Sequence, residues 1–405
     1  MSKLPDWVRN GSKTLPPSRK ISFAGLFSGC GGLDLGAMLA GLNPVYAADS
    51  DPIAVQTYKN NLGSHVDCVD LAKSSIPDSY SDIDLILGGP PCQGFSSAGP
   101  KLRNDPRNRL WQSYLSYVGR WRPKVFLMEN VPGFRREFGS FAREAENILD
   151  GRYKLFERRF ITQYYGVPQF RDRLIIQGVR KDVADGPAWP EPTEREVFSY
   201  RREFPTAISM ESALADLGPA DTANSQFPDH ISVSLAKGDR CIAEHIPNGG
   251  SLKDIPDHQL PETYAGRERT NGGWTWYYRK PQPRLPGRGV IASIRPIYAT
   301  ILAPDVFVKR EAGCWRWDPV DPNSFTNEDG YYSSPVPQRR LSIRECARLQ
   351  TFPDWFRFSG SSLQAHKQIG NAVPVEFARR ICEAVADLIE HGNEAVSQPA
   401  QGKLL

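Results

Sequence analysis

The sequence predicts an α/β protein, in which a smaller, irregular domain is inserted before a doubly wound, Rossmann-like sheet domain is completed. Between residues 20 and 180, short apolar runs alternate with helix-like segments, a pattern typical of a parallel sheet. From about residue 181 to 335 the chain is irregular and rich in Gly, Pro, Trp and Tyr, and helical periodicity returns from residue 341. These changes divide the chain into a flexible lead (1–20), a sheet domain (21–180), an inserted domain (181–335), a return to the sheet domain (336–391) and a tail (392–405).

Each element of the sheet domain follows from a local pattern. Apolar runs bounded by Gly, Pro or Asp predict strands at 21–27, 44–48, 82–87 and 124–128. Segments with helical spacing predict helices at 28–42, 51–62, 108–121, 341–352 and 374–392.

The composition indicates a soluble intracellular, cytoplasmic protein. The net charge of +4 permits a nucleic-acid partner without requiring one. The seven cysteines form no CxxC pair, which favours reduced thiols. No apolar run approaches the roughly 20 residues that span a bilayer, and the first 20 residues lack the apolar core of a signal peptide.

Three consecutive strand ends offer groups suited to an adenosine-type cofactor. The first is a glycine turn, Gly29-Cys30-Gly31-Gly32, which opens into a helix and lets a ligand approach the backbone. Asp49 follows the second strand, where a carboxylate can hold ribose hydroxyls, and Asp70 could accept from an adenine amino group. A plain tight turn is the alternative for the glycines. The cofactor interpretation predicts that Gly31→Val weakens cofactor binding without unfolding the protein.

Chemically reactive side chains follow other strands. Cys92 stands behind two prolines and before a Gly/Ser-rich loop, a geometry that presents a thiol rather than packing one. Glu129 ends the strand at 124–128 and is a candidate proton donor, or else a cap or turn residue. Arg171 and Arg173, two apart on one strand face, could reach an anion or a carbonyl, or form a solvated edge.

Six ordered motifs resemble those of the DNA (cytosine-5)-methyltransferases of the bacterial restriction-modification type. They are "LFSGCGGLDLG", "PPCQGFS", "MENVPGF", "YGVPQFRDR", "RRLSIRECARLQTFPD" and "QIGNAVPV". They cover roughly 21–180 and 339–390. The segment 181–335 matches no motif, as expected of an individual target-recognition domain.

The resemblance implies covalent catalysis with S-adenosyl-L-methionine as methyl donor and S-adenosyl-L-homocysteine as product. It implies that the Cys92 thiolate adds to cytosine C6, that Glu129 contacts N3 and the exocyclic amine, and that Arg171 and Arg173 hold O2 and a phosphate. The implied cofactor contacts are Phe27, Gly29, Cys30, Gly31, Gly32, Asp49, Ser50, Asp70, Leu71, Pro90, Asn371 and Ala372.

The implied partner is double-stranded DNA, from which the target base is flipped out at a cost of about a few kcal/mol. We expect a monomer that binds no membrane, and a companion restriction endonuclease is left open. Expected DNA contacts on the loop after Cys92 are Gln93, Ser96, Ser97, Lys101, Arg103 and Arg107. In the inserted domain, basic residues that could contact bases or phosphates are Arg267, Arg269, Arg279, Lys280, Arg284 and Arg288.

Three other functions fit the sequence less well. An RNA cytosine-5 methyltransferase would carry a Cys-Phe-Thr signature or a second cysteine in place of Glu129, and neither is present. A non-catalytic DNA-binding protein with this fold would not need Cys92, Glu129 and both arginines intact. A nicotinamide-dependent dehydrogenase would account for the glycine turn only.

Overall fold

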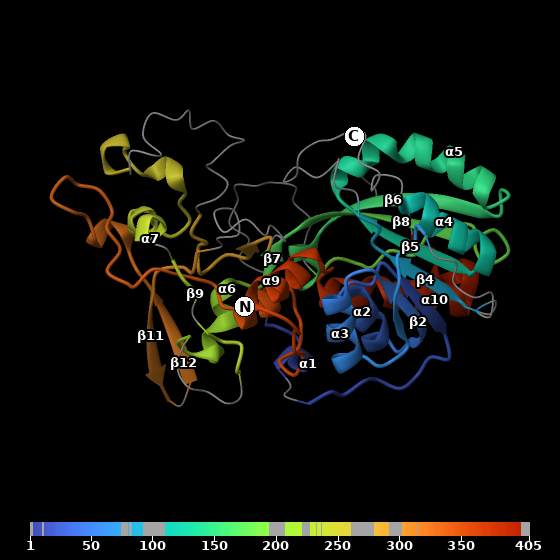
Figure 1. The fold of residues 1–405 in the computed structure, drawn as a ribbon, viewed down its shortest axis with the longest axis horizontal. Helices are drawn as coiled ribbons and strands as arrows, with labels where there is room; N and C mark the ends of the chain where they lie inside the picture. Colours follow the sequence, from blue (N-terminus) through green and yellow to red (C-terminus); the bar gives the residue numbers. More distant parts are fainter. Residues whose placement is uncertain are drawn as a thin grey trace.

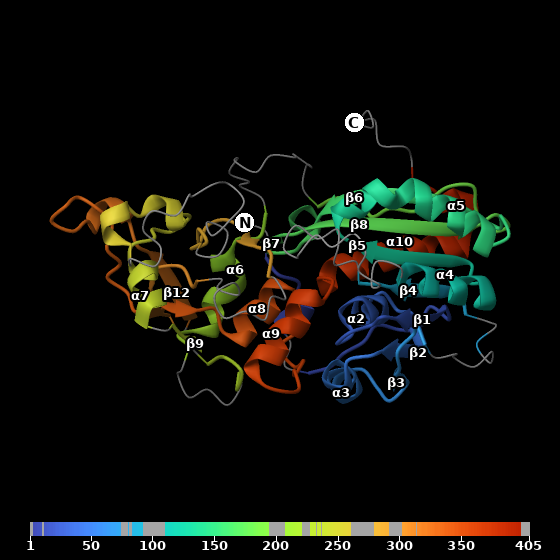
Figure 2. The same cartoon turned by 45° about the horizontal axis from the view of Figure 1, so that its top comes forward.

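The computed structural model describes residues 3–9, 12–73, 80, 83–91, 110–193, 207–220, 227–231, 233–235, 237–260, 279–290, 302–312 and 314–397. The chain forms two lobes (Figure 1). The larger lobe contains the main sheet, and the smaller one contains much of the inserted segment. Helices α8 (Ile343–Leu349) and α9 (Ser362–Asn371) lie between them, as Figure 2 shows.

The main sheet has seven strands in the order β3-β2-β1-β4-β5-β8-β6. Strand β8 runs antiparallel to both β5 and β6, whereas β1 to β5 are parallel. The predicted fold class is confirmed, with this one antiparallel strand as a difference from the expected all-parallel sheet. The bounds are β1 (Ser22–Leu26), β2 (Asn43–Asp49), β3 (Val66–Cys68), β4 (Leu85–Gly88), β5 (Val125–Asn130), β6 (Tyr153–Ile161) and β8 (Asp172–Arg180).

Helices cover both faces of the sheet because alternate strand residues point to opposite sides. On β4, Leu85 and Leu87 join a core with helices α2 (Gly32–Leu39), α3 (Pro52–Asn61) and α10 (Val375–His391). Ile86 between them packs on the other face, with α4 (Leu110–Trp121) and α5 (Phe138–Ile148). None of the helices in the described ranges is both long and apolar enough to cross a bilayer.

The smaller lobe has a core of its own, made by Leu235, Ile242, Ala243, Ile246, Leu252, Ile255, Leu260 and Leu302. Its elements are α6 (Met210–Leu214), α7 (Lys237–Glu244), the hairpin β11 (Val306–Glu311) with β12 (Cys314–Pro319), and the pair β9 (Val233–Ser234) with β13 (Arg339–Arg340). A short strand β10 (Gly287–Arg288) pairs in parallel with β7 (Gln169–Phe170), which immediately precedes β8. This pairing links the inserted segment directly to the sheet domain.

Described parts of the lead and of the tail contact the rest of the protein. Leu4 and Val8 of the lead are buried, the latter on helix α1 (Asp6–Arg9). The Val8 carbonyl accepts a hydrogen bond from Asp354 N at 2.8 Å. Residues 4 and 8 of the lead are therefore packed against the protein, whereas residues 12–18 are exposed, and the flexibility of the lead stays a prediction. In the tail, Ser397 N donates to the Pro187 carbonyl at 2.9 Å, so residues up to 397 are also docked.

Candidate active site and cofactor pocket

The predicted site residues converge at the carboxyl edge of the parallel strands. The glycine turn follows β1, Asp49 ends β2, Pro90 follows β4 and Glu129 lies near the end of β5. Because β1, β2, β4 and β5 are neighbours in the sheet, these four positions share one edge. In open α/β sheets this is the edge at which ligands bind.

The glycine turn is held by Asp49. One carboxylate oxygen of Asp49 accepts from Gly29 N and the other from Asp51 N, both at 2.8 Å. Burial raises the pKa of Asp49. Phe27, which leads into the turn, has a φ of 57°, a left-handed conformation that is uncommon for a non-glycine residue. Strain of this kind gathers at ligand sites, which fits the expected contact of Phe27 with the adenine.

The glycines of the turn face different surroundings. A Cβ added to Gly29 would meet nothing within 4 Å, so this position faces open space. A Cβ on Gly31 would instead lie 2.4 Å from Leu62 Cδ1 and 2.9 Å from Tyr58 Cδ2. The expectation that Gly31→Val would intrude on the cofactor without unfolding the protein is therefore wrong in its physical reason, because the side chain would enter the core.

Cys30 also points inward. Its side chain is buried, and its thiol lies 3.7 Å from the Gln368 carbonyl, which can accept from it. Burial raises the pKa of the Cys30 thiol. Only the backbone of Cys30 is thus placed to line a cofactor pocket.

A carboxylate that sequence reasoning did not select lies under the turn. Asp34, on the first turn of α2, is buried and accepts from Ser28 Oγ at 3.2 Å and from Tyr58 Oη at 3.1 Å. The Tyr58 hydroxyl in turn contacts His65 Nε2 at 3.0 Å. Burial raises the pKa of Asp34 to about 7. An acidic residue inside the otherwise apolar run "GGLDLG" was the available signal for it.

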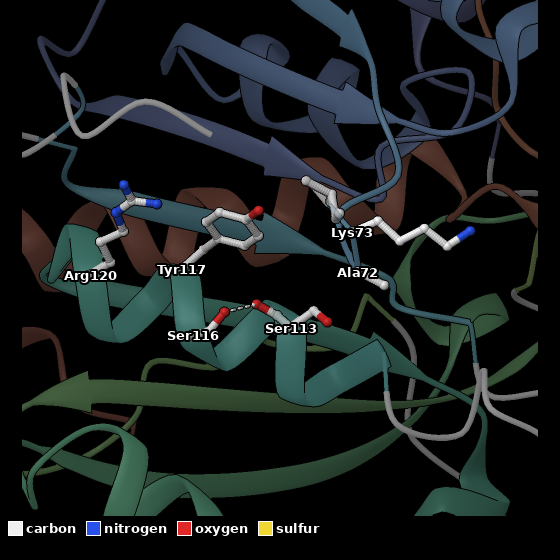
Figure 3. A pocket seen from close by; sticks show the side chains of 7 residues that line it. Ala72, Lys73, Ser113, Ser116, Tyr117 and Arg120 are labelled. Atoms are coloured by element: carbon white, nitrogen blue, oxygen red, sulfur yellow. Dashed lines mark hydrogen bonds between the residues drawn. The ribbon is translucent and has the colours of Figure 1, made fainter. Parts of the chain in front are cut away.

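The expected adenine side of the pocket is more exposed. Asp70 pairs with Lys73 at 3.0 Å, and the hydrogen bond from Lys73 lowers the pKa of Asp70. Ser50 is exposed and Leu71 is buried. A cavity of about 430 Å³ opens beside Leu71, lined by Ala72 and Lys73 and by one face of α4 with Ser113, Ser116, Tyr117 and Arg120 (Figure 3).

The last motif brings the far end of the chain to the same turn. A Cβ on Gly32 would lie 3.0 Å from Ala372 Cβ and 2.7 Å from the Val373 carbonyl oxygen. Asn371, at the end of α9, is exposed. The structure thus brings Ala372 beside the glycine turn, whereas the expected cofactor contacts of Asn371 and Ala372 stay predictions.

Glu129 and Arg173 form an ion pair across adjacent strands. Glu129 Oε1 lies 2.5 Å from Arg173 Nε, and both side chains are only about 15% exposed (14% and 16%). A Cβ on Gly89 would lie 3.4 Å from Glu129 Oε2. Asn130 Nδ2 donates to the Pro90 carbonyl at 3.3 Å. The turn that leads toward Cys92 is therefore held beside the Glu129 carboxylate, although Cys92 itself lies outside the described residues.

Arg171 and Arg173 do not act as the expected pair on one face. Arg171 is buried and donates to the Val290 carbonyl and to the Gly370 carbonyl, each at 2.7 Å. Burial lowers the pKa of its guanidinium. Of the two arginines, Arg173 is the one paired with Glu129, and Arg171 connects segments of the chain instead.

The predicted DNA contacts have mixed outcomes. Lys280 is fully buried and pairs with buried Asp305 at 2.6 Å, and burial lowers its pKa to about 8. Its assignment to DNA is corrected, since an enclosed ammonium cannot reach a phosphate. Arg279 is half-buried and Arg284 is exposed. Outside the described residues or side chains lie Cys92, Gln93, Ser96, Ser97, Lys101, Arg103, Arg107, Arg267, Arg269 and Arg288.

Comparison with known proteins shows the family of this chain. The family model of C-5 cytosine-specific DNA methylase matches residues 21–387. The Type II methyltransferase M.NgoFVII of Neisseria gonorrhoeae is 32% identical over 390 residues, covering 92% of this chain and 89% of that protein. M.BsuRI of Bacillus subtilis is 30% identical over 409 residues, covering 91% and 80%.

Solved structures share the fold. A prophage-encoded DNA modification methyltransferase from E. coli superposes with a TM-score of 0.58 at 23% identity, over 92% of this chain and 100% of that one. A Spodoptera frugiperda DNMT2 mutant gives 0.57 at 17% identity, over 92% and 100%. With the family model spanning nearly the whole described fold and the paired Glu129 and Arg173 at the strand ends, the chain belongs to the C-5 cytosine-specific DNA methylases and is a DNA (cytosine-5-)-methyltransferase.

Proposed function

We propose that this enzyme transfers a methyl group from S-adenosyl-L-methionine to C5 of one cytosine within a specific double-stranded DNA sequence, through a covalent bond between Cys92 and cytosine C6. The observation that supports this best is the Glu129–Arg173 pair beside the Gly89–Pro90 turn. That turn leads into Cys92 at the edge where the cofactor residues also gather.

The residues present fit S-adenosylmethionine. The open side of Gly29 leaves room for a ligand against the backbone, and Asp49 stands beside it with free lone pairs for ribose hydroxyls. Phe27, Asp70 and Leu71 would contact the adenine. When bound, the cofactor supplies a methyl group on a positively charged sulfur, which a carbon nucleophile can accept.

The chain's own residues make C5 into that nucleophile. The Cys92 thiolate forms a bond to C6, and the C5–C6 electron pair becomes available at C5. Glu129 contacts N3 and the exocyclic amine, where charge changes in the adduct. Arg173 holds the Glu129 carboxylate in place for this contact. After methylation, loss of the C5 proton returns an electron pair to the ring and breaks the S–C6 bond.

The target DNA would be read by the smaller lobe. Exposed Arg284 is the described candidate for a phosphate or base contact, whereas Lys280 is left out because it is buried. We expect the enzyme to act in the cytoplasm of its cell as the modification partner of a restriction endonuclease. The names of its curated relatives, which are Type II methyltransferases, support this role.

Cys92→Ser tests the covalent step. We expect methyl transfer to fall below detection while DNA binding survives, because a hydroxyl is far less acidic than a thiol. DNA containing 5-fluorocytosine should trap the wild type covalently, since fluorine cannot leave C5 as a proton does. Bisulfite sequencing of cellular DNA identifies the target sequence for these assays.

The matched control is Cys241→Ser, which removes an exposed thiol in the smaller lobe. This variant should be trapped as the wild type is. Covalent trapping of Cys92→Ser, or its turnover near the wild-type rate, would contradict the proposed mechanism.

A further inference from the structure

Both backbone polar groups of Val290, its N–H and its carbonyl, are hydrogen-bonded to side chains of the segment around β7. Val290 is fully buried and lies two residues after β10. Its N–H donates to Gln169 Oε1 at 2.8 Å, and its carbonyl accepts from Arg171 Nη1 at 2.7 Å. Gln169 and Arg171 therefore fix the position of the inserted segment where it meets the sheet domain.

The same two side chains reach the end of α9. Arg171 Nη2 donates to the Gly370 carbonyl at 2.7 Å. Gln169 Nε2 donates to Gln350 Oε1 at 2.8 Å, and Gln350 Nε2 donates to the Ile369 carbonyl at 2.6 Å. Two hydrogen-bonded routes thus connect Val290 with Ile369 and Gly370.

The end of α9 continues directly into the residues that pack on the glycine turn. Ala372 and Val373 pack against Gly32 so closely that no Cβ could be added there. Gln350 Nε2 also lies 3.3 Å from the Ala372 carbonyl. If all of these buried hydrogen bonds stay intact, a shift of Val290 also moves Ala372.

Breaking one is costly, because Gln169 and Gln350 are fully buried and water cannot replace the lost partner. The network therefore favours one joint arrangement of the inserted segment and the pocket. A ligand that orders the network at one site, the inserted segment or the glycine turn, lowers the entropy cost of binding the second ligand at the other site. This coupling free energy is the same whichever ligand binds first.

We propose that Gln169 is a positioning residue that couples target-DNA binding at the inserted segment to cofactor binding at the glycine turn, with Gln350 as its relay. This inference rests on the proposed function, since it takes S-adenosylmethionine and target DNA as the two ligands. Gln169 touches neither ligand and acts through Val290 and Gln350.

Gln169→Met tests the coupling, because methionine has a similar shape and lacks the amide. Affinity for S-adenosylhomocysteine is measured calorimetrically with and without a duplex that carries the methylated sequence. In the wild type we expect the duplex to increase the affinity for S-adenosylhomocysteine about five-fold or more, an effect called tightening below. In Gln169→Met only the route through Arg171 remains, so the tightening should fall clearly below the wild-type value, while binding of S-adenosylhomocysteine alone persists.

The control is Gln177→Met. Gln177 is an equally buried glutamine on β8 whose amide bonds the Ala188 backbone, away from both the inserted segment and α9. This variant should lose a similar amount of stability and keep the wild-type tightening. Tightening retained in full by Gln169→Met, or absent from the wild type, would overturn the coupling.

Hydrogen exchange on the wild type gives a readout that needs no variant. Added S-adenosylhomocysteine, without DNA, should slow exchange in peptides covering Gly287–Val290 as well as in those covering residues 369–373. Slowing confined to the glycine turn and 369–373 would contradict the coupling alone. A chain that binds no S-adenosylhomocysteine and methylates no DNA would contradict the proposed function itself.

Discussion

A methyl group added at Gly29 would enter open space, whereas one added at Gly31 would enter the core between Leu62 and Tyr58. Both glycines have positive φ, 55° and 91°, so either alanine carries a backbone cost of about 1–2 kcal/mol. We predict that Gly29→Ala folds with only that loss and binds S-adenosylhomocysteine more weakly, because its methyl lies beside the Asp49-held turn.

Gly31→Ala should lose about 1–3 kcal/mol more in the free energy of unfolding than Gly29→Ala, because overpacking adds to the backbone cost that both variants share. Urea unfolding and calorimetric titration of both variants check this pair. Equal stability of the two alanine variants would show that the turn relaxes at Gly31, and unchanged affinity in Gly29→Ala would remove that face from the cofactor site.

Asp34 predicts a pH dependence of stability. Its pKa is about 7 in the folded protein, against a usual value of 3.8. Between these values the folded chain holds a proton that the unfolded chain has released, so this residue's contribution to stability falls as pH rises from about 4 to 7. Ser28, Tyr58, His65 and Asp49 are the polar groups around it, and an asparagine could keep both hydroxyl contacts.

Asp34→Asn should therefore match the wild type near pH 4 and exceed it at pH 8. The pKa difference of about three corresponds to at most about 4 kcal/mol. Urea unfolding of both proteins at several pH values measures the difference, in which the contribution of His65 cancels. A constant difference from pH 4 to pH 8 would mean that Asp34 titrates normally.

The position of a site residue could be predicted where its place on a strand alone determines it. It could not be predicted where a partner far away in the sequence determines it. Asp49 and Glu129 lie at the sheet edge because any residue ending a parallel strand lies there. Lys280 reads as one more basic residue in a basic stretch, yet it pairs with Asp305, 25 positions away. Likewise, nothing near Gly31 in the sequence reveals that Tyr58 occupies the space beside its Cα.

At the scale of elements, the lead segment shows how a polar, proline-containing stretch can still dock. Leu4 and Val8 are nearly or fully buried, and Arg9 Nη2 donates to the Ser212 carbonyl at 2.7 Å. The sequence pattern around them is too short to show helical periodicity, because α1 has only four residues. Strands β1, β4 and β5 were predictable for the opposite reason, since each is a largely buried apolar run between turn signals.

Leu4→Ala tests the docking of this segment. Burial of the side chain at 2% exposure predicts a loss of about 2–5 kcal/mol, limited by the free energy at which the lead undocks as a unit. The control is Leu15→Ala in the same segment, 37% exposed, which should change stability by less than about 1 kcal/mol. Urea unfolding and limited proteolysis of the lead measure both; equal protease sensitivity of the two variants would contradict docking through Leu4.

At the scale of the whole molecule, helix α8 joins the two lobes through buried arginines. Arg344 donates both Nε and Nη2 to the Asp229 carboxylate, at 3.0 and 2.7 Å. Arg348 bonds Asp354 with two nitrogens at 2.7 Å and reaches the Ala213 carbonyl and Asp216 on the α6 side. Asp216 also pairs with Arg9 of the lead, at 3.2 Å. These contacts explain why "RRLSIRECARLQTFPD" carries charged residues on a buried helix.

Arg348→Met should destabilise the protein by about 3–5 kcal/mol, because Asp354, only 3% exposed, would be left without its bidentate partner. Lys309→Met is the control: the Lys309–Asp318 pair is more than half exposed on both sides, and its loss should cost less than about 1 kcal/mol.

The double variant Arg348→Met/Asp354→Leu separates charge from packing. If the Asp354 carboxylate, left with the longer Arg344 contact at 3.9 Å, causes the loss, the double variant regains much of the stability in urea unfolding, since an apolar pair can replace a buried ion pair. If it remains as unstable as Arg348→Met, the contacts of Arg348 with Ala213 and Asp216 hold the lobes together instead.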